Sequence, residues 1–352
     1  MKIIVTSGGT GGHIYPAVSL IKYLENNGEE VVFIGCKNMM EEEICVRDGI
    51  KFVGLDLKKG KGIINKIKFI FNLFKSCLKT NKLIKDFKAD VVVGFGNYIS
   101  FPVCLTAYFK RIPIVLHEQN SIMGKANKIL GYLAKKIGYS IPLIKEYHKE
   151  KLVNVGNPRS NECLKNTPCN YEVDVTKNNI LIFMGSLGSS TVNETLKQFI
   201  LENNDSNIYH IITGKKHYSS FITDIKEKEN FKIYPYVNDM ISLMKKCDLV
   251  VTRSGATTVS EITTLGLASI LIPSPYVVKN HQFFNALYLY KNDACLMLEE
   301  KNLSYKTLKE QIEYLLNNSE ERVKIRINSL KLAIFDSNNK LYKLIKEVSY
   351  GK

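Results

Sequence analysis

Short apolar runs alternate with longer helical patterns along this chain. A first series of runs covers residues 2–6, 31–35, 51–55, 90–94, 113–117 and 136–139, and a second series covers 179–184, 208–213, 231–235, 248–252, 269–272 and 295–298. Apolar runs of this length with helices between them are typical of parallel strands that are buried on both faces. The pattern therefore predicts an α/β fold with two parallel sheets covered by helices.

A polar stretch at residues 156–178 separates the two series, and it contains Pro158, Pro168 and many Asn and Lys residues. The chain of 352 residues is also longer than the roughly 250–300 residues at which a single core stops growing. We therefore expect two doubly wound, Rossmann-like domains, residues 1–158 and residues 159–334. Apolar spacing in residues 335–352 predicts a last helix that crosses back to the first domain.

A glycine-rich loop follows the first apolar run directly. Residues Ser7–His13 read Ser-Gly-Gly-Thr-Gly-Gly-His and lead into a helical pattern. Free backbone N–H groups and the helix dipole make such a helix start suitable for an anion, usually a phosphate. The loop is not a dinucleotide fingerprint, because Ile14 replaces the third glycine and no acid ends the second strand at Gly35-Cys36. It is not a P-loop either, because no Gly-Lys-Ser/Thr closes it.

Two further polar loops follow strands of the first half. Gly94–Tyr98 comes after the fourth run, and His117–Asn120 ends the fifth. Because the carboxyl ends of parallel strands meet at one edge of a sheet, we expect these loops to share a crevice with the first one. Glu118, beside His117, is a candidate general base. A hydrogen-bonded turn remains an alternative for any one of these residues taken alone.

The second half repeats the strand–loop–helix pattern. Met184–Ser190 is a second loop suited to an anion, and Thr252–Glu261 begins at a strand end and runs into a helix. Glu261 lies inside that helix, where a carboxylate could bond both hydroxyls of a ribose. His281–Asn285 supplies polar groups suited to sugar hydroxyls, and it follows Pro273-Ser274-Pro275.

The charge of the chain narrows the class of partner. The net charge is +15 and the pI is about 9.2, so we expect acidic partners: a phosphorylated substrate, an anionic membrane or nucleic acid. Residues 58–88 carry ten lysines and one acid, Asp86, interleaved with Ile63, Ile64, Ile67, Phe69, Ile70, Phe71, Leu73 and Phe74. A basic amphipathic segment of this kind favours a membrane surface. The alternative is a solvated helix whose apolar stripe packs on its own sheet.

Cysteine usage and hydropathy indicate a cytosolic protein. The eight cysteines form no Cys-x-x-Cys pair and no cluster with histidine, which favours reduced thiols. We expect no signal peptide and no spanning helix, because no apolar run approaches about 18–20 residues, so any membrane contact is peripheral. No Asp-x-Asp motif stands at a strand end, and we therefore expect neither a metal nor another cofactor.

Five motifs together resemble the MurG family, the UDP-N-acetylglucosamine:undecaprenyl-pyrophosphoryl-muramoyl-pentapeptide N-acetylglucosamine transferases of peptidoglycan synthesis. The motifs are Gly8–His13, His117–Asn120, Gly156–Arg159, Arg253–Glu261 and His281–Ala286. The resemblance covers nearly the whole chain. It implies a GT-B fold of two Rossmann-like domains with the active site in the cleft between them. It also implies that the nucleotide sugar binds mainly to the second domain and the acceptor, lipid I, to the first.

The resemblance also implies roles for individual residues. His13 and Glu118 match the candidates for the catalytic base, and we favour His13 because imidazole titrates near neutral pH. Glu261 matches the ligand of the ribose, and Val237 matches the position whose backbone pairs with uracil. The full set of donor-binding matches is Thr10, Gly11, Gly12, Asn120, Arg159, Ser186, Val237, Arg253, Ser254, Gly255, Ala256, Thr257, Thr258, Val259, Ser260, Glu261, Gln282 and Asn285. The acceptor-binding matches are Gly94, Gly96, Asn97 and Tyr98.

Two positions depart from the family pattern. Leu187 stands where the third loop usually carries a polar residue, and Asn97 stands where the second loop usually carries a third glycine. The first change removes any contact that a polar side chain would make there. The second leaves the backbone of its loop less free.

The expected reaction is an inverting transfer of GlcNAc from UDP-GlcNAc to the C4 hydroxyl of MurNAc in lipid I, which gives lipid II. The implied partners are UDP-GlcNAc, lipid I and, through residues 58–88, the anionic cytoplasmic face of the cell membrane. Cell-wall synthesis proteins are further candidate partners, and we expect no nucleic acid. The alternatives are another GT-B nucleotide-sugar enzyme (a diacylglycerol glucosyltransferase or a UDP-GlcNAc epimerase), an NAD-dependent oxidoreductase, and a non-catalytic membrane or nucleic-acid binder.

Overall fold

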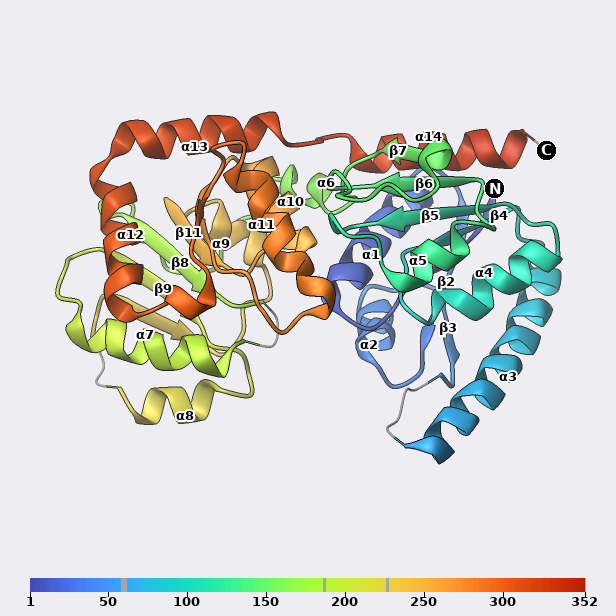
Figure 1. The fold of residues 1–352 in the computed structure, drawn as a ribbon, viewed down its shortest axis with the longest axis horizontal. Helices are drawn as coiled ribbons and strands as arrows, with labels where there is room; N and C mark the ends of the chain where they lie inside the picture. The colour runs from blue at the N-terminus through green and yellow to red at the C-terminus, as the bar shows by residue number, and fades with distance from the viewer. Residues whose placement is uncertain (58–61, 186–187, 226–227, 352) are drawn as a thin grey trace. The chain divides into compact units, whose positions relative to one another are not determined.

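The computed structural model describes residues 1–57, 62–185, 188–225 and 228–351, and the chain forms two units. The first unit contains Met1–Asn161 and Ile334–Lys352, and the second contains Glu162–Ala333 (Figure 1). Each unit is built on one parallel sheet.

The sheet of the first unit has seven parallel strands within the described residues. They are β1 (Lys2–Thr6), β2 (Glu30–Cys36), β3 (Phe52–Leu55), β4 (Val91–Gly94), β5 (Ile114–Glu118), β6 (Lys136–Tyr139) and β7 (Leu152–Asn154). Their order in the sheet is β3-β2-β1-β4-β5-β6-β7. Each of the six apolar runs predicted from the sequence forms a strand here. The sequence missed β7, because this short edge strand is partly exposed and has no apolar run.

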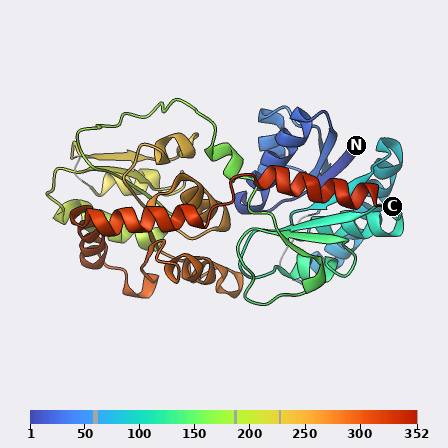
Figure 2. The same cartoon turned by 90° about the horizontal axis from the view of Figure 1, so that it is seen from above.

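The helices of the first unit lie between its strands. They are α1 (Gly11–Asn26), α2 (Met40–Arg47), α3 (Ile63–Phe87), α4 (Ser100–Phe109), α5 (Lys125–Leu130), the short η1 (Lys149–Lys151) and α6 (Ser160–Cys163), with which the chain enters the second unit. The last helix, α14 (Ser337–Tyr350), follows the whole second unit in the sequence and lies along the strands of the first sheet (Figure 2). Its buried Leu341 and Ile345 share a core with Ile3 and Val5.

The second unit has six parallel strands within the described residues, in the order β10-β9-β8-β11-β12-β13. They are β8 (Asn179–Phe183), β9 (Ile208–Ile212), β10 (Phe231–Tyr234), β11 (Leu249–Thr252), β12 (Ala268–Leu271) and β13 (Leu296–Met297). Its helices are α7 (Ser190–Glu202), α8 (Tyr218–Thr223), α9 (Met240–Met244), α10 (Ala256–Leu265), η2 (Val278–Asn280), α11 (His281–Tyr290), η3 (Glu300–Asn302), α12 (Tyr305–Asn317) and α13 (Ser319–Lys331).

Both sheets reverse their strand order at one point, between β1 and β4 in the first unit and between β8 and β11 in the second. Loops at the carboxyl ends of the two strands that flank such a switch point diverge and leave room for a ligand. The glycine loops predicted from the sequence follow these four strands. The topology therefore confirms the α/β class and gives each unit its own ligand-suited sheet edge.

Helix α3 carries apolar side chains on two sides. Phe69 and Leu73 pack against the core below, and Ile84 and Phe87 near the end of the helix are buried. On the other side, the exposed apolar side chains are Ile67, Ile70, Phe71, Phe74 and Leu78, with 55–66% of their surface accessible. The alternative interpretation of α3, a helix whose apolar side chains only pack on its own sheet, thus explains the buried side of the helix. It does not explain the exposed apolar side. Residues 58–61 of the basic segment lie outside the described residues.

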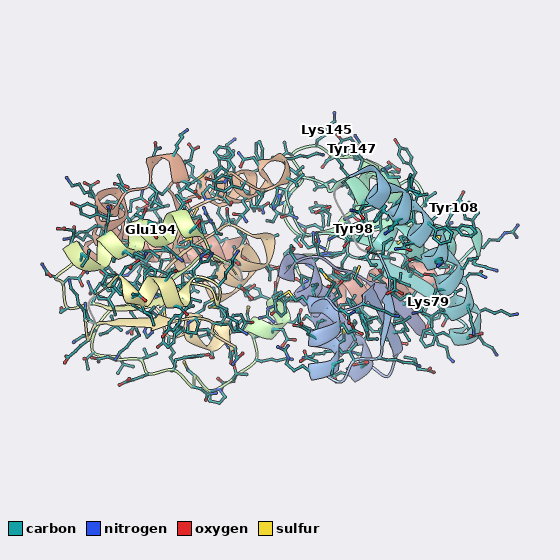
Figure 3. The ribbon with its side chains drawn as sticks, turned by 90° about the horizontal axis from the view of Figure 1, so that it is seen from below. Lys79, Tyr98, Tyr108, Lys145, Tyr147 and Glu194 are labelled. Atoms are coloured by element: carbon teal, nitrogen blue, oxygen red, sulfur yellow. The ribbon has the colours of Figure 1, made fainter. Side chains whose placement is uncertain are left out.

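The amphipathic helix is attached to the sheet by polar contacts as well as by apolar ones. The Lys79 ammonium of α3 donates to the carbonyl of Gly54 at 2.7 Å (Figure 3).

No helix among the described residues has the length and apolar character needed to span a membrane. All eight cysteines lie in the described ranges, and none of them forms a disulfide.

Candidate active site

The loop after β1 has a conformation that requires glycine. Gly9 has a φ of +96°, and a Cβ atom built there would lie 1.9 Å from Nδ2 of Asn97. The Ser7 hydroxyl donates to the carbonyl of His13 at 2.8 Å, which ties the start of the loop to the first turn of α1. Thr10, the residue before α1, makes no side-chain capping bond within the described chain. The loop therefore presents the predicted helix start, with His13 in its first turn.

Asn97 joins the two glycine loops of the first unit. Its amide nitrogen donates to the carbonyl of Gly8 at 2.8 Å, and its side-chain oxygen accepts from the backbone N–H of Tyr98 at 2.6 Å. Its φ of +64° lies in the left-handed region that Asn tolerates better than most residues. The departure from the family pattern thus keeps a backbone shape suited to glycine and adds a side-chain bridge between the loops.

Glu41 is an acid at this sheet edge that sequence reasoning missed. Its carboxylate is fully buried and accepts from the backbone N–H of Cys36 at 3.0 Å. A Cβ atom at Gly8 would lie 2.6 Å from Glu41 Oε1, so this carboxylate also limits the residue at Gly8. The signal was present in the run Glu41-Glu42-Glu43 at the start of α2, but three acids in a first turn are usually explained by the helix dipole alone.

A network of side chains connects His13 to the loop after β5. His13 Nδ1 lies 2.6 Å from Gln119 Oε1 and 3.0 Å from the carbonyl oxygen of Phe95. Gln119 Nε2 lies 3.0 Å from His117 Nδ1, and His117 Nε2 lies 2.9 Å from the carbonyl oxygen of Gly156. The network therefore runs from the glycine loop through a buried amide to a buried histidine.

His117 is neutral at physiological pH. The pKa of its imidazole is lowered to about 4, mainly by burial and to a smaller extent by the neighbouring His13, against the opposing effect of the hydrogen bond to Gly156. Its ring packs beside that of Phe95, with 5.0 Å between the ring centroids. A neutral, fully buried imidazole is suited to orienting a neighbour and unsuited to exchanging protons with a substrate.

The Glu118 carboxylate is surrounded by donors. Its Oε2 accepts from the backbone N–H of Gly124 and from Asn127 Nδ2, both at 2.9 Å. Its Oε1 accepts from the backbone N–H of Asn120 at 3.1 Å and lies 3.5 Å from Asn120 Nδ2. Only 1% of the residue is exposed. Glu118 is thus built into the turn before α5, as the structural alternative from the sequence suggested.

Two other candidate residues of the first unit pack against aromatic side chains. Tyr98 contacts Phe69 of α3 edge-on at 5.9 Å between ring centroids, and burial raises the pKa of its phenol. The Arg159 guanidinium lies over the ring of Tyr15 at 5.2 Å. The structure places Arg159 in the first unit. Gly94 ends strand β4, and Gly96 lies in the loop that follows it, together with Tyr98.

Arg253 of the second unit is held by partners of its own sheet edge. Its guanidinium donates to the carbonyl of Ile272 at 3.1 Å and to the hydroxyl of Ser189 at 3.0 Å, and it forms an ion pair with Glu300 at 2.5 Å. Only 6% of Arg253 is exposed. Because Ser189 precedes α7, the guanidinium connects the loop after β8 with the loop after β11.

Gln282 and Asn285 of α11 also support the loop after β11. Ser254 donates its hydroxyl to the carbonyl of Gln282 at 2.7 Å, and Asn285 Nδ2 donates to the carbonyl of Ser254 at 3.0 Å. The side-chain oxygen of Gln282 accepts from the backbone N–H of Ser274 at 2.8 Å. These bonds give both amides a positioning task that the sequence did not indicate.

The remaining donor candidates are distributed over the second unit. Residues Ala256, Thr257, Thr258, Val259, Ser260 and Glu261 lie in the first turns of α10, which Gly255 precedes. Glu261 and Val237 are buried. The backbone N–H of Asn238, next to Val237, donates to the Tyr171 hydroxyl at 3.1 Å. Ser186 and Leu187 lie outside the described residues.

The chain matches the two domains of one enzyme family. The glycosyltransferase family 28 N-terminal domain matches residues 3–139, and the C-terminal domain of the same family matches residues 179–347. The chain belongs to glycosyltransferase family 28. A relative from Thermoanaerobacter sp. (strain X514) is 36% identical, with 99% of this chain and 100% of the relative covered. A relative from Bacillus subtilis (strain 168) is 33% identical, with 99% of both chains covered.

Both relatives carry the same name, UDP-N-acetylglucosamine--N-acetylmuramyl-(pentapeptide) pyrophosphoryl-undecaprenol N-acetylglucosamine transferase. Among solved structures, the MurG of Acinetobacter baumannii matches with a TM-score of 0.78 at 24% identity, covering 98% of this chain and 99% of that chain. A UDP-GlcNAc 2-epimerase from Neisseria meningitidis matches with a TM-score of 0.71 at 15% identity, covering 99% and 100%. The family 28 chain therefore has the GT-B fold, and it is a glycosyltransferase.

Proposed function

We propose that this glycosyltransferase transfers GlcNAc from UDP-GlcNAc to the C4 hydroxyl of MurNAc in lipid I and so produces lipid II for peptidoglycan synthesis. The observation that carries the proposal is full-length identity of 33–36% to relatives that share one transferase name. The structural likeness to epimerases concerns the fold alone, and one fold supports many chemistries.

We propose His13 as the base of this reaction. The bond from the acceptor O4 to C1 of GlcNAc forms while the bond from C1 to the β-phosphate oxygen breaks. UDP leaves with the electron pair, and the proton of the hydroxyl moves to the imidazole. Among the described residues, the hydrogen bonds of the His13 side chain engage Nδ1, whereas both oxygens of Glu118 already accept backbone and amide donors. The contacts within the first unit therefore favour His13 as the group that meets the substrate.

The second unit supplies the groups for the donor. UDP gains negative charge as it leaves, and helix N-termini stabilise such charge. Helices α7 and α10 both begin at the carboxyl edge of the second sheet, next to its switch point. In this proposal the start of α10 faces the diphosphate, Glu261 binds the ribose hydroxyls and the backbone at Val237 pairs with uracil. Arg253 then acts by holding the two loops, since its guanidinium is paired with Glu300.

We further propose that the transfer proceeds without a metal. The sequence has no Asp-x-Asp motif at a strand end, and helix N-termini can stabilise the charge of the leaving group. UDP release in the presence of EDTA should equal the release in buffer with Mg²⁺. A loss of activity in EDTA that Mg²⁺ restores would overturn this part of the proposal.

We propose that α3 attaches the protein to the cytoplasmic face of the cell membrane, where lipid I would be within reach. The exposed stripe of α3 is accompanied by lysines, which suits anionic headgroups above an acyl boundary. The double variant Phe71→Glu/Phe74→Glu should bind vesicles of anionic phosphatidylglycerol at least tenfold more weakly. The matched control, Tyr314→Glu/Val323→Glu, changes two half-exposed residues of the second unit and should bind as the parent does. Equal binding of all three proteins would overturn the assignment.

One assay separates the candidate functions. Purified protein with UDP-GlcNAc and a lipid I analogue should release UDP, and the release should depend on the acceptor. Release or epimerisation of UDP-GlcNAc without an acceptor would favour an epimerase instead. Binding to anionic vesicles without UDP release from any acceptor would favour a non-catalytic role.

A further inference from the structure

The geometry points to Gln119 as a positioning residue that decides which nitrogen of His13 carries the proton. This inference rests on the proposed function, in which the other nitrogen of His13 takes the proton of the acceptor hydroxyl. Gln119 is not among the residues that the sequence motifs single out for donor or acceptor. It is fully buried between His13 and His117.

The surroundings of the Gln119 amide fix its orientation. The carbonyl oxygens of Phe95 and His117 lie 3.3 Å and 3.1 Å from the atom assigned as Nε2. Because a carbonyl oxygen only accepts, the amide end that faces two of them must be the NH2 group. The opposite assignment would place an oxygen against two oxygens in a buried site. The end of Gln119 that faces His13 is therefore the carbonyl oxygen.

This orientation determines the tautomer of His13. Nδ1 lies within hydrogen-bond distance of two acceptors, Gln119 Oε1 and the carbonyl oxygen of Phe95, so Nδ1 must carry the proton. In the neutral ring the lone pair is then on Nε2, the nitrogen suited to act as base. After proton uptake the same two acceptors stabilise the imidazolium, as the acid of a catalytic triad does for its histidine.

His117 in turn holds Gln119. Its Nε2 faces the carbonyl oxygen of Gly156, so in the neutral ring Nε2 is the protonated nitrogen and Nδ1 accepts from the Gln119 amide. The low pKa of His117, about 4, agrees with a ring that stays neutral in this arrangement. Three hydrogen bonds with fixed donors and acceptors thus connect Gly156 to His13. They require a proton on Nδ1 of His13, so Nε2 is the nitrogen left to act as the base.

The first test is a measurement on the unaltered protein. With ¹⁵N-histidine labelling, the six histidines give long-range ¹H–¹⁵N correlations that distinguish a protonated ring nitrogen from an unprotonated one. A His13→Asn spectrum assigns the signal. We expect His13 with a protonated Nδ1 and an unprotonated Nε2 at pH 8. A His13 ring protonated at Nε2 in the unaltered protein would overturn the inference, and this readout does not depend on activity.

The second test compares Gln119 variants. Gln119→Met fills the site without polar groups, so we expect a mixture of His13 tautomers and a kcat about 10²-fold lower, with the KM for UDP-GlcNAc within threefold. Gln119→Glu, as the protonated acid, keeps an acceptor toward Nδ1 and a donor toward the carbonyl oxygens of Phe95 and His117, so the Nδ1-protonated form should return, with kcat between those of the parent and Gln119→Met. Gln198→Met, at an exposed glutamine of α7, serves as the matched control and should retain full activity.

The outcomes separate the inference from the proposed function. An unchanged tautomer and an unchanged kcat in Gln119→Met would overturn the positioning role. If the unaltered protein released no UDP with lipid I while His13 showed the expected tautomer, the proposed function would fail and the positioning of His13 would stand. If Gln119→Met did not fold, the spectrum of the unaltered protein would still decide.

Discussion

The carboxyl edges of the two sheets share one topology but carry different kinds of polar structure. In the first sheet, neutral amides, carbonyls and a neutral histidine surround His13 and engage only one of its ring nitrogens within the described residues. In the second sheet, the guanidinium of Arg253 is a buried positive charge, and Glu300 compensates it. The carbonyl of Ile272 and the hydroxyl of Ser189 accept two further hydrogen bonds from this guanidinium. In the proposed function, the first edge thus prepares a reactive group, and the second holds two loops in a fixed relation.

The difference shows how one fold can divide the work of a reaction. A base needs a defined proton position and an accessible nitrogen, which a neutral network supplies without shifting charge around it. A binding surface for a diphosphate needs helix starts that do not move, and a buried ion pair between loops serves that purpose. The comparison predicts that replacing His13 at the first edge has the largest effect on the rate, whereas breaking the Arg253–Glu300 ion pair at the second edge has the largest effect on stability.

Replacing His13 should give the largest effect on the rate. We expect His13→Ala to lower kcat by about 10³-fold, because general base catalysis typically contributes 10²–10⁴-fold. The KM for UDP-GlcNAc should stay within threefold, since the proposed donor site lies mainly in the second unit. Acceptor-dependent UDP release measures both values. A near-normal kcat would remove His13 from its role and reopen the choice of base.

Breaking the ion pair at the second edge should have the largest effect on stability. In Glu300→Gln the Arg253 cation loses its buried counter-charge, which typically lowers the free energy of unfolding by about 3–5 kcal/mol. Urea denaturation of the full-length protein measures the loss. Arg253→Met combined with Glu300→Gln removes the stranded charge and should recover part of it. A Glu300→Gln protein as stable as its parent would show that the ion pair does not hold these loops.

Glu118→Gln tests the two roles considered for this residue. The substituted amide nitrogen would face a backbone or amide donor, so we expect a loss of about 1–3 kcal/mol in the free energy of unfolding. The kcat measured well below the melting temperature should fall less than tenfold. Glu194→Gln, on the exposed side of α7 (Figure 3), is a control that should change neither value. A kcat loss of about 10³-fold at unchanged stability would instead identify Glu118 as the base.

Asn97→Gly should have the smallest effect. Glycine accepts the φ of +64°, so the variant removes only the bridge to the carbonyl of Gly8 and the bond to Tyr98. We expect a loss of about 1 kcal/mol in stability and a two- to fivefold lower kcat. Thermal melting and UDP release measure these changes. An increase in kcat would indicate that the bridge restrains a loop movement that the reaction needs.

The sequence predicted the fold well, because buried parallel strands have continuous apolar runs that stand out from the helices. It missed β7, whose residues are partly exposed. It also predicted that glycine loops gather at the sheet edges, since topology follows from the alternation of strands and helices. Which residues lie in those loops could therefore be predicted, whereas what their side chains contact could not.

The contacts depend on three-dimensional packing that no local pattern shows. Gln119 stands beside Glu118, and only the structure shows that the amide faces His13 while the carboxylate faces a turn. Arg253 belongs to a motif associated with the donor, and the structure pairs it with a glutamate 47 residues further along the chain (300 − 253). The contacts of Glu41 could not be predicted either, because its position beside the first loop depends on the path of α2.

Helix α14 has a consequence for the synthesis of this protein. It contributes Leu341 and Ile345 to the core of the first sheet and contacts β5, but it leaves the ribosome only after all of Glu162–Ala333. At about 5–20 residues per second, the first sheet waits roughly 10–40 s for this helix. The half of the chain that is translated first is therefore completed last. In a nascent chain without α14, strand β5, which carries His117, lacks the helix that packs against it. The hydrogen-bond network around His13 should therefore form only once α14 has been made.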